Sequence, residues 1–174
     1  MTDRRPTARG TVPGATRGTV PRAARGTVPR ARAVVSLGSN VEPRAEYLAR
    51  ALAALDALPC TRLVKASSVI ETEPVDVPPE FAHLKFLNQA ALFETALEAH
   101  DFSRRMHGIE DALGRVRTVR NGPRTIDIDL IDFDGLVLNE PELTLPHPRA
   151  PERDFVLLPL AELGIAPSLF SSPH

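Results

Sequence analysis

The sequence predicts an α+β domain of the ferredoxin-like class, a β-α-β-β-α-β sandwich with a C-terminal extension. Two observations predict this class. Two stretches carry apolar residues at helical spacing, and four short apolar runs, bounded by turn residues, indicate strands around them. Elements in this order place two helices on one face of an antiparallel sheet. The chain has 174 residues, of which 43% are hydrophobic, enough for one domain with an appendage.

The first half of the pattern starts with the apolar run at residues 33–38, which we expect to form a strand. Apolar side chains then recur at helical spacing through residues 43–57, and Pro59 ends this helix. Residues 62–72 contain several β-branched side chains and predict the second strand. The segment 73–79 holds three prolines, which remove backbone donors, so it should be a long loop.

The second half repeats a strand and a helix. Residues 88–93 are an apolar run that predicts the third strand. A helix should follow, because apolar residues step by four, three and four positions from Phe102 to Leu113. Residues 95–98 have the spacing of a capping box before this helix, and Gly114 is placed to end it.

The remainder of the chain adds the fourth strand and the extension. Residues 126–133 predict the strand, and Asp134-Gly135 predicts a tight turn into a short strand at 137–138. Residues 155–163 should form a final helix. We expect Asp132 and Asp134 to lie at the turn and on the surface.

The N-terminal 32 residues differ from the rest in charge and in repetition. The sequence Arg-Gly-Thr-Val-Pro occurs three times with a period of eight, starting at Arg9, Arg17 and Arg25. Residues 1–33 hold eight Arg and one Asp, a balance of +7, whereas residues 34–174 have a balance of -8. We expect residues 1–32 to be a disordered tail, either dispensable or weakly attracted to acidic surfaces, and residues 33–174 to be the folded domain.

Composition argues against several classes of protein. Cys60 is the single cysteine, so an intramolecular disulfide is impossible and we expect a reducing, cytoplasmic location. No apolar run approaches the roughly 18 residues that span a bilayer. The glycine-rich signatures of P-loop NTPases and of dinucleotide-binding folds are absent from the sequence.

The sharpest local signal is the segment Ile126-Asp127-Ile128-Asp129-Leu130. Alternation along a strand directs the apolar side chains to the core, so Asp127 and Asp129 share the opposite face. Two neighbouring carboxylates repel each other unless they face water or hold a cation. A hard cation such as Mg²⁺ takes one or two carboxylates together with substrate phosphates. The pattern therefore indicates either a metal site or a solvated sheet face.

A loop with four arginines precedes this pair: Arg115, Arg117, Arg120 and Arg124. The planar guanidinium group matches the oxygens of phosphate. Cations beside a carboxylate pair are what a polyphosphate and its metal ion require, because both stabilise the charge that develops during transfer. The alternative is a basic loop neutralised by nearby acids. The adjacency of the two features favours phosphoryl chemistry.

The segment Arg120-Asn121-Gly122-Pro123-Arg124-Thr125-Ile126-Asp127-Ile128-Asp129 resembles the hallmark of the 6-hydroxymethyl-7,8-dihydropterin pyrophosphokinase family. Further blocks resemble that family in the same order along the chain: residues 36–40, 67–75, 86–90, 109–117 and 143–155. The resemblance covers residues 34 to about 165. Phe86 stands where members often have Tyr. Residues 33–174 are thus identified as a pterin pyrophosphokinase domain.

The resemblance implies transfer of a diphosphate from Mg-ATP to 6-hydroxymethyl-7,8-dihydropterin, with release of AMP, by a monomeric enzyme of folate biosynthesis. It implies that Asp127 and Asp129 bind two Mg²⁺ ions and that Arg115 and Arg124 stabilise the transferring group. The residues expected around ATP are Glu110, Arg117, Arg120, Thr144, His147 and Arg153. The residues expected in the pterin pocket are Thr72, Val75, Asn88 and Phe155.

Two other functions fit parts of the pattern. A ferredoxin-like module with a basic tail could bind RNA, but the domain is acidic and lacks the paired aromatic residues of an RNA-binding sheet. A degenerate pyrophosphokinase could bind pterin without turnover, but both aspartates and both arginines are retained. We therefore expect two small-molecule substrates, with neither a membrane nor a nucleic acid as partner.

Overall fold

The computed structural model describes residues 30–116 and 122–165, and its centre is a five-stranded sheet. Four strands follow one another in the order β2-β4-β1-β5, and β3 pairs with β4 beyond the end of β2. Every pairing is antiparallel. The strands are β1 (Ala31–Ser39), β2 (Thr61–Ala66), β3 (Ile70–Thr72), β4 (Phe86–Thr95) and β5 (Asp127–Phe133). The α+β class predicted from the sequence is confirmed.

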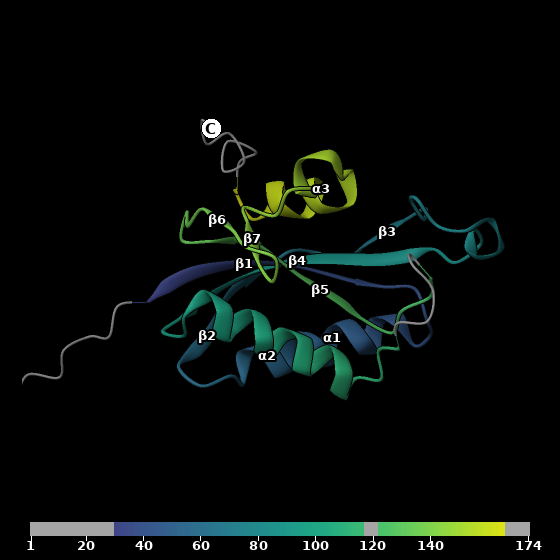
Figure 1. Ribbon diagram of the computed structural model, residues 1–174. Coiled ribbons are helices and arrows are strands. Elements are labelled where there is room, and N and C mark those ends of the chain that lie inside the picture. The colour runs from purple at the N-terminus through teal and green to yellow at the C-terminus, as the bar shows by residue number, and fades with distance from the viewer. Residues whose placement is uncertain (1–29, 117–121, 166–174) are drawn as a thin grey trace, which may run out of the picture.

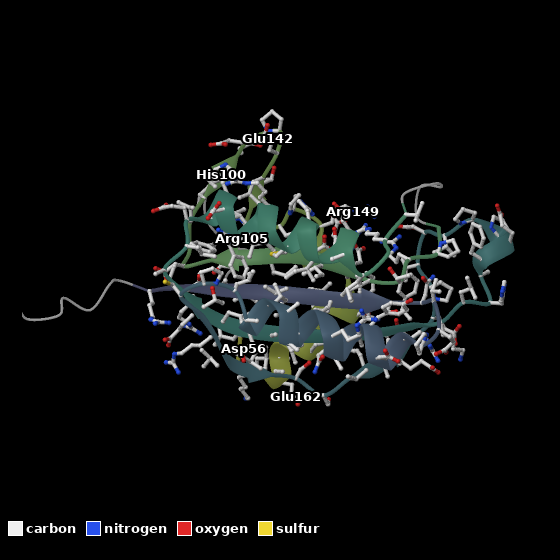
Figure 2. The ribbon with its side chains drawn as sticks, turned by 90° about the horizontal axis from the view of Figure 1, so that it is seen from below. Asp56, His100, Arg105, Glu142, Arg149 and Glu162 are labelled. Atoms are coloured by element: carbon white, nitrogen blue, oxygen red, sulfur yellow. The ribbon has the colours of Figure 1, made fainter. Side chains whose placement is uncertain are left out.

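Helices cover the two faces of the sheet unequally (Figure 1). The helices α1 (Arg44–Asp56) and α2 (Ala99–Ala112) lie side by side on one face, as the sequence predicted. The helix α3 (Asp154–Glu162) lies on the other face. Seen from the α1 and α2 side, these two helices lie in front of the sheet and α3 behind it (Figure 2). A small ribbon pairs β6 (Leu138–Asn139) with β7 (Thr144–Leu145).

The main core lies between the sheet and the first two helices. Three phenylalanines meet there in tilted contacts, with ring centroids 6.4 Å apart for Phe93 and Phe102 and 6.1 Å apart for Phe102 and Phe133. Met106 and Leu55 are also buried in this cluster. The helical spacing in the sequence therefore identified the buried faces.

Among the described residues, no helix is long and apolar enough to cross a membrane.

The predicted strand 62–72 is two strands. Between them, the Ser67 hydroxyl accepts a hydrogen bond from the Ala90 backbone N–H at 3.0 Å and donates one to the Ser68 carbonyl at 2.8 Å. A side chain thus replaces a backbone partner of β4, which interrupts the regular pairing. The first strand also begins earlier than predicted, because residues 31 and 32, assigned to the tail, pair with Thr95 and Glu94.

The capping box predicted at residues 95–98 does not form. The Thr95 hydroxyl instead accepts the Leu97 backbone N–H at 3.1 Å and bonds the Thr61 hydroxyl at 2.7 Å. Glu98 occupies the cap position of α2 and makes no side-chain cap hydrogen bond. At the other end of the helix the prediction holds, because Gly114 adopts a φ of 80°, where other residues would be strained.

A bulge in β5 buries Asp132, which was expected on the surface. Val35 pairs with Leu130 and Val34 pairs with Asp132, so Ile131 is an additional residue. Asp132 is 3% exposed, and only one of its carboxylate oxygens has a hydrogen-bond partner among the described residues. Burial raises its pKa above the ordinary value. Asp134, in contrast, is exposed as predicted.

Replacing Asp132 with asparagine is expected to raise the melting temperature at pH 8 by about 2–4 °C, because the ionised side chain is poorly solvated. Since the folded pKa is raised, this destabilisation is present above that pKa and disappears as the pH falls through it towards the ordinary value. The difference in melting temperature between the variant and the wild type should therefore become smaller as the pH is lowered from 8 to 4. Thermal unfolding of both proteins across this range measures it, and a constant difference would contradict the explanation.

Candidate active site

The two aspartates of β5 project from the sheet on the face covered by α3. Ile128 and Leu130 alternate with them and are buried in the main core, which confirms the predicted alternation. In the neighbouring strand β1, Gly38 pairs with Asp127 and Ser36 pairs with Asp129. Because these partners are small, the carboxylates border an open space on the sheet surface.

A pocket lies over this part of the sheet. Its floor comes from β1, β4 and β5, one wall from the segment after β3, and the other wall from the segment that leads into α3. Eight of the residues predicted from the sequence line it together: Thr72, Val75, Asn88, Arg124, Asp127, Asp129, Arg153 and Phe155. The fold therefore brings the predicted metal, phosphate and pterin residues to one place.

Asp127 is held between two arginines. Arg115 approaches one carboxylate oxygen at 2.5 Å, and Arg124 forms an ion pair with the other oxygen. Burial raises the pKa of Asp127, but the charges of Arg124 and Arg115 outweigh burial, so the pKa lies below its ordinary value. Asp127 is therefore ionised, and it fixes both arginines at the edge of the pocket.

Asp129 is in a different electrostatic environment. Burial, together with the charge of Asp127, raises the pKa of Asp129 above its ordinary value. Its nearest described cation is Arg153, whose Nη1 lies 3.9 Å from a carboxylate oxygen. A divalent cation beside the two carboxylates would remove this repulsion. Asp127 and Asp129 are the described residues that could hold such a cation, because Mg²⁺ binds one or two carboxylates together with phosphate oxygens and water.

Glu110, expected from the sequence to lie around ATP, is a buried carboxylate at the end of α2. Its side chain is 1% exposed, and its carboxylate forms an ion pair with Arg115 and accepts the Ile128 backbone N–H at 2.8 Å. Burial raises the pKa of Glu110, although the charge of Arg115 opposes this. Glu110 connects the end of α2 to Arg115 and to the strand of the two aspartates.

The part of the pocket that we call the aromatic end is lined by an amide and two aromatic rings. The Asn88 side-chain amide donates to the Thr72 hydroxyl at 2.8 Å, which fixes its orientation. The rings of Phe86 and Phe155 both line the pocket. Arg124 lies over Phe86 with its guanidinium carbon 5.7 Å from the ring centre, so the aromatic end is continuous with the charged end.

Four of the described residues predicted for the site lie outside the pocket lining: Arg115 and Glu110, described above, and His147 and Thr144. The His147 backbone N–H donates to the Ile131 carbonyl at 2.8 Å, and burial lowers the pKa of its side chain. The charge of Asp129 acts on this ring in the opposite direction, so His147 lies near the carboxylate pair. Thr144 belongs to the β6–β7 ribbon and donates to the Glu140 carbonyl at 3.4 Å. Arg117 and Arg120 lie outside the described residues.

Several lining residues were not predicted from the sequence. The alternation of side chains along a strand could have indicated three of them, Ser36, Gly38 and Phe86. Each is two positions from another lining residue or faces one across the sheet. Asp76 and Arg149 also line the pocket, and their loops contain no periodic pattern that could have indicated it.

A carboxylate pair, fixed arginines and an aromatic end in a single pocket define an enzyme of phosphoryl transfer. Residues 34–165 match the family 7,8-dihydro-6-hydroxymethylpterin-pyrophosphokinase (HPPK). The chain belongs to this family, which confirms the resemblance found in the sequence.

Bacterial relatives support this assignment. The chain is 40% identical over 131 residues to the 2-amino-4-hydroxy-6-hydroxymethyldihydropteridine pyrophosphokinase of Bacillus subtilis, covering 75% of this chain and 77% of the relative. It is 43% identical over 139 residues to the protein of the same name from Methylorubrum extorquens, covering 79% and 84%.

Solved structures support the fold. A crystal structure of an HPPK-DHPS protein in complex with substrates aligns with a TM-score of 0.59 and 13% identity, covering 78% of this chain. The aligned part is 40% of that longer chain. The HPPK-DHPS of Plasmodium falciparum gives a TM-score of 0.57 over 79% of this chain and 41% of its own.

Proposed function

We propose that the pocket binds ATP and 6-hydroxymethyl-7,8-dihydropterin together, and the roles of its residues follow from this arrangement. The chain transfers a diphosphate from ATP to the pterin in folate biosynthesis, as its family does. The hydroxyl oxygen of the pterin forms a bond to the β-phosphorus of ATP and loses its proton. The bond between the β-phosphorus and the oxygen that bridges it to the α-phosphorus breaks, and AMP leaves. The observation that carries this function is the continuity between the carboxylate pair and the aromatic end of the pocket.

The aromatic end is the proposed pterin site. A pterin is flat and has amide-like edges, so it requires stacking rings and a polar partner. Phe86 and Phe155 supply rings, and Asn88, oriented by Thr72, supplies the amide. Val75 adds an apolar contact from the loop after β3.

The charged end is the proposed nucleotide site. Asp127 and Asp129 would hold Mg²⁺, as two ions, and the bound metal would neutralise phosphate charge. Arg115 and Arg124 are positioned by Asp127 to stabilise the transferring group. The nucleotide side is also the proposed location of Glu110, Arg153, Thr144 and His147. The same role is proposed for Arg117 and Arg120.

The test is AMP release by the purified protein with ATP, Mg²⁺ and 6-hydroxymethyl-7,8-dihydropterin. We expect AMP only when the pterin is present, and none after EDTA is added. Formation of ADP would show transfer of a single phosphoryl group and would reject the reaction. AMP release that is independent of pterin would indicate hydrolysis.

Gly38 is predicted to be necessary for pterin binding. A Cβ atom at this position would lie 3.1 Å from the Asn88 Oδ1 atom, so alanine would displace the amide that recognises the pterin. We expect Gly38→Ala to raise the KM for pterin by about tenfold, with a smaller effect on the KM for ATP. Gly108→Ala is the control, because nothing lies within 4 Å of its added Cβ. Equal pterin KM values in the two variants would contradict the prediction.

We also propose the finer description of the fold as ferredoxin-like, which the antiparallel order β2-β4-β1-β5 supports. The β6–β7 ribbon and α3 then form the extension. We also propose that the protein is a monomer. The exposed thiol of Cys60 is consistent with the proposed cytoplasmic location. We propose that the folded domain begins at Ala31, the first residue of β1, instead of at residue 33.

A further inference from the structure

An ion pair joins the two walls of the pocket. The Arg149 Nη2 atom lies 3.1 Å from the Asp76 Oδ2 atom, and both residues line the pocket. Asp76 belongs to the loop 73–85, which projects beyond the ends of β3 and β4 (Figure 1). Arg149, labelled in Figure 2, belongs to the segment between β7 and α3. These residues are 73 positions apart in the sequence, so the pair is a contact between distant segments.

The arginine end of this pair is fixed to the sheet. The Arg149 backbone N–H donates to the His147 Nδ1 atom at 3.2 Å. The His147 backbone N–H in turn donates to the Ile131 carbonyl of β5 at 2.8 Å. Arg149 therefore extends from an anchored segment on the nucleotide side of the pocket.

The aspartate end belongs to a loop that is fixed at its base. Thr72 pairs with Phe86 where the loop leaves the sheet, and Lys85 forms an ion pair with Glu73 at 2.6 Å. Beyond this base, Asp76 adopts a φ of 56°, and its side chain meets Arg149. The pair with Arg149 thus connects the projecting part of the loop to the opposite wall, beside the proposed pterin site.

The pair also changes the charge that a ligand would meet. The described pocket lining holds five carboxylates, namely Glu73, Asp76, Asp127, Asp129 and Glu152, and three arginines, namely Arg124, Arg149 and Arg153. The carboxylate of Asp76 repels the phosphates of ATP. Arg149 neutralises this carboxylate while it holds the loop.

We propose that Arg149 is a positioning residue that holds loop 73–85 over the pterin site through Asp76, and so determines pterin affinity. This inference rests on the proposed function of the pocket. Exposed ion pairs contribute modestly, so the expected weakening of pterin binding is about two- to fivefold when either partner is neutralised. The two losses should not add, because each variant removes the same contact.

The experiment compares Arg149→Gln, Asp76→Asn, the double variant and the exchanged pair Asp76→Arg with Arg149→Asp. Steady-state kinetics should show a raised KM for pterin with an unchanged kcat in both single variants, no further rise in the double variant, and recovery in the exchanged pair. Arg149→Gln alone should also raise the KM for ATP, because it removes a positive charge from the pocket lining. The control is the double variant Asp101→Asn with Arg105→Gln, which neutralises an exposed ion pair on α2 outside the pocket lining. It should leave both KM values and kcat unchanged.

Hydrogen exchange of loop 73–85 in the protein without substrates gives a readout that is independent of the reaction. Exchange should become faster in both single variants and return towards the wild-type rate in the exchanged pair. This result would support the inference even if no AMP were formed. Unchanged exchange, or a loss of ATP affinity in Arg149→Gln with no change in pterin KM in Asp76→Asn, would overturn it and make Arg149 a direct phosphate contact.

Discussion

Replacing Asp129 with asparagine is expected to lower turnover by about 10²–10³-fold without destabilising the metal-free protein. The reason is that the ionised carboxylate of Asp129 destabilises the folded, metal-free protein. Burial and the neighbouring Asp127 raise the pKa of Asp129, so ionising this carboxyl is less favourable in the folded protein than in the unfolded chain. Asparagine at this position carries no charge for Asp127 to repel. The substitution also removes a proposed ligand of the metal ion. The melting temperature in EDTA should therefore be equal to that of the wild type or higher.

The measurement pairs pterin-dependent AMP release with thermal unfolding in EDTA. Asp134→Asn provides a matched control, because Asp134 is exposed on the turn after β5 and its positive φ suits asparagine. This control should retain normal turnover. Near-normal activity of Asp129→Asn would show that the carboxylate does not serve the reaction, and a large fall in its melting temperature would show that its role is structural.

The largest effect on stability is expected for Glu110→Ala, a loss of about 3–5 kcal/mol in the free energy of unfolding. The substitution removes the more deeply buried of the two carboxylates that pair with Arg115, so that only Asp127 remains, and it leaves the Ile128 backbone N–H without an acceptor. Turnover should fall as well, because Arg115 and the strand that carries Asp127 lose their support. Urea unfolding and AMP release measure the two effects.

Two further variants separate the contributions of Glu110. Glu110→Gln keeps an acceptor for the Ile128 N–H and should lose less stability than the alanine variant. His107→Ala removes the half-exposed partner of Glu110, 3.1 Å away, and should cost less than about 1 kcal/mol. If the His107 variant were as unstable as Glu110→Ala, the stabilisation would come from the helix surface instead of from the buried pair.

Periodic patterns in the sequence identified most of the fold. The faces of α1 and α2 and the alternation in β5 follow from burial of one face, which repeats in the sequence. Local hydrogen bonds carry no such period. The hydroxyl of Ser67, which divides the second strand, and the alternative partner of Thr95 depend on neighbours that are distant in the sequence. The bulge that buries Asp132 likewise depends on pairing with β1.

The candidate site shows the same division. Asp127 and Asp129 were identified because alternation fixed their common face, and Arg124 because it precedes them in the chain. The resemblance to a family supplied Asn88 and Phe155, whose residue types alone are common in cores and at strand ends. Sequence could not show that Glu110 is enclosed behind Arg115, because that depends on how the end of α2 meets β5. It could not show the pair of Asp76 with Arg149 for a similar reason.

The direction of β1 has a practical consequence for work with this enzyme. Ala31 pairs with Thr95 at one end of the strand, whereas Gly38 borders the pocket near the other end. Seven residues at about 3.3 Å each separate these positions by about 23 Å. An affinity tag, fluorescent reporter or surface linker joined before residue 30 would therefore be attached away from the pocket. A chip that captures the protein through this end would present the pocket to ligands in the flow.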